Sequence, residues 1–123
     1  MRKTVYVDGY VLTVTKKNFA AYRRMATMAG RIWRKHGALR YVECVGEDMR
    51  NPWGKTFTKL AKPKRNEVVV FSYIEYRSRA HRDAVNAKVM KDHAMQDTSP
   101  KDQPLPFDMK RMAWGGFKAF VSY

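Results

Sequence analysis

The segment that decides the fold is VVVFSYIEYRSRAHRDAVNAKVMKD, residues 68–92. Its first nine residues are rich in β-branched and aromatic side chains in both alternating sets, which predicts a central strand covered on both faces. Ser78 follows as a predicted helix N-cap, because its hydroxyl can accept a hydrogen bond from a backbone N–H of the first turn. The predicted helix has one face defined by residues that recur at four-residue steps: His81, Val85 and Val89.

The rest of the chain supplies three more strands and one more helix by the same patterns. An apolar stripe at steps of three and four residues predicts the other helix, which begins after Thr15 and ends at Gly37. Proline, glycine and basic residues indicate a loop over residues 49–66. Three prolines indicate an extended linker over residues 94–107. The remaining predicted strands cover residues 4–14, 39–48 and 110–122.

The predicted order of elements is therefore βαββαβ. Two right-handed βαβ units of this kind give an α+β, ferredoxin-like fold, in which a four-stranded antiparallel sheet carries two helices on one face. The other face of the sheet would present valine and aromatic side chains, which are too apolar to face water. We therefore expect a homodimer in which the sheets of two copies pack face to face.

Length and composition narrow the class of protein. A chain of 123 residues predicts a single domain, residues 1–123, and no apolar run approaches the roughly 20 residues that cross a bilayer. The only cysteine, Cys44, cannot form an internal disulfide, which favours a reducing, cytoplasmic location. The formal net charge of +14 favours anionic partners, although the basic residues are scattered and are also typical of a solvated surface.

Four blocks along the chain form a recognisable pattern. They are YVDGY at 6–10; HGAL at 36–39 with YVEC at 41–44; SRAHRD at 78–83 with VNAKVM at 85–90; and PFD at 106–108 with KRM at 110–112 and GGF at 115–117. Together they resemble the YbaA-like family of small bacterial proteins, a domain of unknown function numbered fourteen twenty-eight. The resemblance implies a dimeric α+β barrel built from two ferredoxin-like sheets, and it implies no established activity.

Polar groups embedded in otherwise apolar segments are the candidates for a ligand pocket between sheet and helices. A carboxylate inside a strand has a pKa raised by desolvation unless an arginine such as Arg111, or a tyrosine, pairs with it. A histidine near the start of a helix can act as a general base or as a metal ligand near neutral pH. The candidate polar groups and walls of this pocket are Asp8, Glu43, Tyr73, His81, Arg111 and Trp114.

Each candidate also has a structural interpretation. Asp8 and Glu43 could form ion pairs across the dimer, His81 could be hydrogen-bonded within a packed helix face, and the aromatic residues could be interface core. Metal and cofactor binding are not expected, because the chain has no HxxxH, HxH or CxxC motif and no glycine-rich phosphate loop.

Three functions remain compatible with the sequence, which names no substrate and no reaction. The first is a homodimer that binds or converts a small organic molecule in a cleft without a metal. The second is a nucleic-acid or polyanion binder that uses the basic surface, although residues 68–76 lack the basic-Gly-aromatic pattern of RNA-recognition strands. The third is a structural or regulatory dimer without a ligand.

Overall fold

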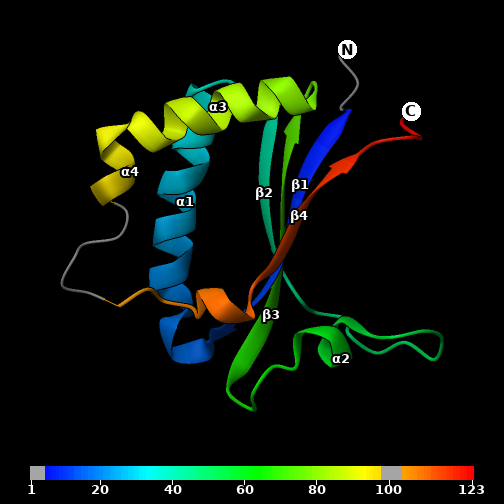
Figure 1. Cartoon of the computed structure of the whole chain (residues 1–123). Helices are drawn as coiled ribbons and strands as arrows, with labels where there is room; N and C mark the ends of the chain where they lie inside the picture. Colours follow the sequence, from blue (N-terminus) through cyan, green and yellow to red (C-terminus); the bar gives the residue numbers. More distant parts are fainter. Residues whose placement is uncertain (1–4, 98–103) are drawn as a thin grey trace.

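The computed structural model describes residues 5–97 and 104–123, in which four strands form one antiparallel sheet with helices beside it (Figure 1). The order across the sheet is β2-β3-β1-β4, so the α+β class is confirmed and β3 is central. The strands are β1 (Tyr6–Thr15), β2 (Arg40–Val45), β3 (Glu67–Tyr76) and β4 (Ala113–Lys118), and the long helices are α1 (Phe19–Lys35) and α3 (Arg79–Lys91).

Three short helices, α2, α4 and η2, were not predicted, and a fourth, η1, is a separate 3-10 turn at the start of the helix predicted after Thr15. The strand predicted over residues 110–122 is shorter, because η2 occupies its start and β4 covers only Ala113–Lys118. The predicted loop over residues 49–66 contains α2, and the predicted linker over 94–107 begins within α4, with residues 98–103 outside the described part of the chain. A helix of five residues is too short to show an apolar period, so its capping residues carry the signal. For α2, the Thr56 hydroxyl accepts the Lys59 N–H. The short helices are η1 (Lys16–Asn18), α2 (Phe57–Ala61), α4 (His93–Asp97) and η2 (Met109–Arg111).

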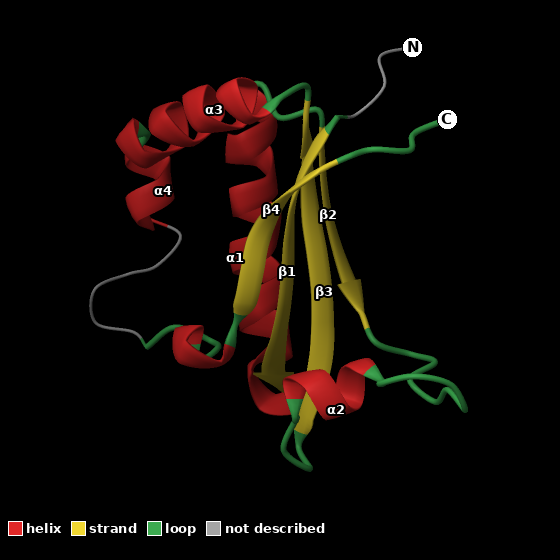
Figure 2. Ribbon diagram, turned by 45° about the vertical axis from the view of Figure 1, so that its right-hand side comes forward, coloured by secondary structure: helices red, strands yellow, loops and turns green. Residues whose placement is uncertain are grey.

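The junction between β3 and α3 forms as the sequence predicts. The Ser78 hydroxyl accepts a hydrogen bond from the backbone N–H of His81 at 3.0 Å, which caps the helix. Val85 and Val89 on the inner face of α3 are buried. Figure 2 shows α3 starting beside the end of the sheet where β3 finishes and running away from the strands toward α4. Gly37 has the positive φ, 112°, expected of a residue that ends a helix, and it follows α1.

The strand register separates two chemically different faces of the sheet. On β1, Asp8 lies opposite Ile74 and Tyr10 opposite Ser72, so these four side chains share the face that α1 and α3 cover. This helix-covered face also carries Tyr41 and Glu43 of β2, which were predicted to lie on one side of their strand. Its core is closed by large buried side chains, among them Leu12, Val14, Val70, Ile74 and Tyr76.

The opposite face of the sheet, here called the open face, is apolar and only partly covered. It carries the alternate residues of the same strands: Val7, Val11, Val42, Phe71, Tyr73 and Phe117. α2 lies on this side at one end of the sheet, where the Phe57 ring packs against Phe71 with centroids 6.0 Å apart (Figure 1). Phe71 is still 41% exposed and Phe117 63% exposed.

No helix in the described part of the chain is both long and apolar enough to span a membrane.

Candidate functional site

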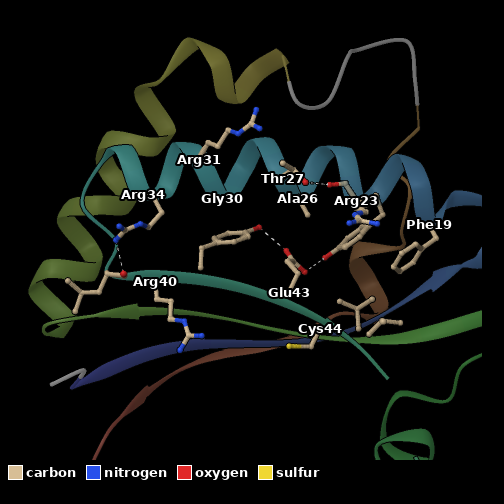
Figure 3. Close-up of a pocket in the computed structure, with 15 residues that line it drawn as sticks. Phe19, Arg23, Ala26, Thr27, Gly30, Arg31, Arg34, Arg40, Glu43 and Cys44 are labelled. Atoms are coloured by element: carbon tan, nitrogen blue, oxygen red, sulfur yellow. Dashed lines mark hydrogen bonds between the residues drawn. The ribbon is translucent and has the colours of Figure 1, made fainter. Parts of the chain in front are cut away.

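An open groove of about 840 Å³ runs between α1 and the edge strand β2 (Figure 3). Residues of α1 at helical spacing form its inner wall. The small residues among them, Ala26 and Gly30, leave space beside β2. Strand β2 contributes Tyr41 and Glu43 from the helix-covered face. The residues of α1 that line the inner wall are Phe19, Tyr22, Ala26 and Gly30.

Glu43 is held at the base of the groove by two phenols. The Tyr22 hydroxyl donates to Oε1 and the Tyr41 hydroxyl donates to Oε2, each at 2.8 Å. Tyr41 reaches this position because α1 has a glycine above its ring. A Cβ on Gly30 would lie 2.9 Å from Cδ1 of Tyr41, closer than real Cβ atoms come to another heavy atom. The close approach of α1 to β2 therefore depends on Gly30.

The electrostatics of this centre favour phenols as donors and the carboxylate as acceptor. Burial raises the pKa of Glu43, while hydrogen bonds from Tyr22, Tyr41 and Ser72 lower it in part. Burial and the nearby Glu43 charge also raise the pKa of both tyrosines well above the ordinary value. A carboxylate desolvated in this way can accept a hydrogen bond or a proton from a bound molecule.

Four arginines line the groove, and they point in different directions. Arg34 is already engaged, because its Nη1 donates to the carbonyl oxygens of Ala38 and Leu39 at 2.9 and 2.6 Å. Figure 3 shows Arg31 directed away from Glu43 and Arg40 on the other side of β2. Arg23 is exposed and forms no ion pair with any residue in the described ranges 5–97 and 104–123.

Asp8 forms a separate buried centre under α3. Only 1% of its surface is exposed, and its Oδ1 accepts a hydrogen bond from Arg82 Nη1 at 2.6 Å. Burial raises the pKa of Asp8, and the Arg82 charge opposes that rise. Arg82 also lies 5.1 Å from the centroid of the Tyr6 ring. The sequence reasoning missed Arg82, although the position four residues after the Ser78 cap places it on the first full turn of α3.

The two aromatic candidates lie on opposite faces of the sheet. Trp114 stacks on Tyr10 with centroids 6.4 Å apart and rings inclined by 20°, and 65% of it is exposed at the β4 edge. Burial raises the pKa of Tyr10 to about 12, so its phenol is neutral beside Asp8. Tyr73 packs against Phe71 on the open face, with centroids 6.0 Å apart. The structure therefore does not bring Tyr73 together with Asp8, Glu43 or Trp114.

His81 and Arg111 lie apart from both carboxylates. The His81 Nδ1 accepts the backbone N–H of Arg77 at 3.0 Å, and its ring packs edge-on against Tyr76. Arg111 makes a bidentate ion pair with Glu67, in which both N···O distances are 2.8 Å. These hydrogen bonds from Arg111 hold the pKa of Glu67 at about 2. The partner of Asp8 is thus Arg82 of α3 and not Arg111 of η2, which is engaged with Glu67.

Within the described residues, no three His, Cys, Asp or Glu side chains gather as potential metal ligands. The only cysteine of the chain, Cys44, is an exposed free thiol at the groove.

Two solved structures match this chain only weakly. One is a Bacillus cereus protein related to NIF3, at 14% sequence identity and a TM-score of 0.33. The other is a hydantoinase/carbamoylase family amidase from Burkholderia ambifaria, at 15% identity and a TM-score of 0.35. The chain spans only 28% of the length of each, and likenesses this weak carry no functional information.

Sequence comparison gives a much closer relationship. The family model described as "Protein of unknown function (DUF1428)" matches residues 5–109. The Uncharacterized protein YbaA of Escherichia coli K12 is 42% identical over 116 residues, which cover 94% of this chain and 97% of that protein. The protein of the same name from Shigella flexneri matches to the same extent. The chain belongs to the DUF1428 family.

Proposed function

We propose that this protein is a cytoplasmic homodimer that binds a small organic molecule, without a metal, in the groove between α1 and β2. The observation that carries the proposal is the groove itself, about 840 Å³ in volume, with a hydrogen-bonded carboxylate at its base. Ligand sites in proteins combine apolar walls with a few well-placed polar groups in a volume of roughly 300–1,000 Å³. Glu43 and its two phenols supply the polar groups here.

The open face supports the dimer. It is an apolar surface on the side of the sheet away from α1 and α3, and monomeric proteins rarely leave such a surface in water. Because the groove lies at the β2 edge on the helix side, face-to-face packing of two sheets leaves it accessible in each copy.

We expect the Thr27→Trp variant to bind the fluorescent dye anilinonaphthalene sulfonate at least about tenfold more weakly than the parent protein. Thr27 is exposed and lines the groove, so an indole at this position occupies the space that the dye needs. The measurement is a fluorescence titration at fixed protein concentration, with thermal melting to confirm that the variant is folded.

Met28→Trp is the matched control, because Met28 is the next residue of α1 and does not line the groove. It should bind the dye as the parent does. Equal dye affinity in Thr27→Trp and the parent would place the dye elsewhere and would contradict the proposed site. No dye binding by any of the three proteins would favour a structural dimer without a ligand.

A second candidate function is polyanion binding along α1. The basic side chains of η1 and α1 are all exposed, and the α1 sequence contains no acidic residue. These residues are Lys16, Lys17, Arg23, Arg24, Arg31, Arg34 and Lys35. Lys35 pairs with Asp92 at 3.2 Å, and the other six form no ion pair within the described residues, so they are available to attract a phosphate backbone.

If this surface binds nucleic acid, affinity for a fluorescently labelled, mixed-sequence single-stranded RNA should fall steeply between about 50 and 200 mM salt, because counterions are released from neutralised phosphates. Fluorescence anisotropy measures the effect. Arg24→Gln combined with Arg31→Gln should weaken binding further at the lower salt concentration. Absence of any anisotropy change at about 50 mM salt would remove this function.

A further inference from the structure

We infer that the groove accepts a hydroxylated aromatic carboxylic acid, whose hydroxyl donates to Glu43 and whose carboxylate pairs with Arg23. This inference rests on the proposed ligand-binding function and adds the chemical class of the ligand. Three features of the groove carry it: an acceptor at the base, a lining cation that pairs with no acid in the described residues, and aromatic side chains in the inner wall.

The base of the groove selects a neutral hydrogen-bond donor. The carboxylate of Glu43 accepts the two phenols and a hydrogen bond from Ser72, and its roughly four lone-pair sites leave room for one more donor, so a group bound there must donate. An anionic group would meet the Glu43 charge. An ammonium group would have to approach through the exposed basic side chains of α1, which carry the same charge. A hydroxyl donates without either repulsion.

The cation in the lining selects an anion at the other end of the ligand. Of the four lining arginines, Arg34 is occupied by backbone carbonyls, and Arg31 and Arg40 are directed elsewhere (Figure 3). The Arg23 guanidinium forms no ion pair with an Asp or Glu in the described residues. A guanidinium binds a planar carboxylate well, because two of its N–H groups can donate to the two carboxylate oxygens.

The aromatic side chains in the inner wall of the groove favour a ligand that contains an aromatic ring. The aromatic surface of the wall comes from Phe19 and Tyr22 of α1. Ala26, one turn after Tyr22, adds only a methyl group to the wall. Tyr22 is fixed in place by its hydrogen bond to Glu43 and by edge-on packing against Phe107, with centroids 5.7 Å apart. A flat aromatic body can therefore lie against a rigid wall without displacing a side chain.

The test is an NMR titration of the isotope-labelled protein with three probes: para-hydroxybenzoate, para-cresol and benzoate. We expect para-hydroxybenzoate to bind about five- to tenfold more tightly than either probe that lacks one polar group. Amide shifts should concentrate in α1 and β2. Arg23→Gln should abolish the preference over para-cresol. Arg24→Gln, on the neighbouring residue that does not line the groove, should preserve it.

Glu43→Gln provides the complementary readout, because a neutral amide oxygen is a weaker acceptor than a carboxylate. It should reduce the preference over benzoate while leaving the preference over para-cresol. Equal binding of all three probes in the groove, unaffected by Arg23→Gln, would overturn the ligand class while the groove remained a binding site. If no probe shifts the amides of α1 and β2 at millimolar concentration while the dye still binds there, the ligand class is again wrong. If the dye also fails to bind, the proposed function itself fails.

Discussion

Replacing Arg82 with methionine should lower the free energy of unfolding by about 3–5 kcal/mol, the usual result of removing one partner from a buried ion pair. The Arg82 side chain is 13% exposed and that of Asp8 only 2%, so the remaining carboxylate would be left in an apolar environment. Methionine keeps much of the arginine stem's packing. The loss therefore reports mainly on the Asp8 charge and not on a cavity.

The same variant should show a characteristic pH dependence. Burial already raises the pKa of Asp8 in the folded state, and loss of the opposing Arg82 charge should raise it further. A group whose folded-state pKa lies above its unfolded value contributes stability below the unfolded pKa, and that stability is lost as pH rises through the folded pKa. The deficit of Arg82→Met relative to the parent should therefore be larger at pH 8 than at pH 5.

Urea denaturation at the two pH values measures this difference, and the other titrating groups largely cancel because parent and variant share them. Arg79→Met, which removes an exposed arginine from the same helix, should change stability by less than about 0.5 kcal/mol. Adding Asp8→Asn to Arg82→Met should recover part of the loss, since it removes the unpaired charge. A deficit of the same size at pH 5 and pH 8 would contradict an unpaired carboxylate as its cause.

The parts of the fold that the sequence predicts are those specified by local chemistry. The Ser78 cap, the positive φ of Gly37 and the shared face of Tyr41 and Glu43 each depend on a few neighbouring residues, and each is found in the structure. The central position of β3 also follows from its own composition, because apolar side chains in both alternating sets need cover on both faces.

The pairings at the candidate sites could not be predicted in the same way. The chain contains 25 lysines and arginines, so the partner of Asp8 depends on which element brings a basic side chain within reach of β1. Arg111 is one of the two kinds of partner that the sequence suggests, and in the structure Arg82 takes that role because Arg111 of η2 pairs with Glu67 at the start of β3. Tyrosine was also considered as a partner, and Glu43 does accept two phenols. That Tyr22 is one of them depends on the rotation of α1 about its axis.

Asp8 also shows why the assignment of faces needs the structure. Its alternation with Tyr6 and Tyr10 places the three on one side of β1, as the strand period requires. Valines occupy the other set, so apolarity alone does not decide which side the helices cover. The buried polar group ends up beneath the helices because Arg82 on α3 satisfies it there. The sheet face away from α1 and α3 keeps the valines, and that arrangement leaves the open face apolar.

The Val11→Lys variant should convert a dimer of this protein into monomers. Val11 lies opposite Phe71 on β3 and Ala113 on β4, which places it among the inner strands of the open face. It is partly exposed in the single chain, so a lysine there can reach water and the chain can still fold. Between two packed sheets the same ammonium group would lose its hydration without a partner, which should weaken dimerisation at least about a hundredfold.

Multi-angle light scattering after gel filtration measures the outcome. The molar mass of the parent should be twice the 14.4 kDa mass of one chain, and that of Val11→Lys should equal the mass of one chain. Met28→Lys makes a similar change on exposed α1, away from the open face, and should remain dimeric. A parent that is monomeric at high micromolar concentration would overturn the proposed sheet packing. A dimeric Val11→Lys would move the interface away from the open face, because a buried, unpaired lysine is not compatible with a tight sheet-to-sheet contact.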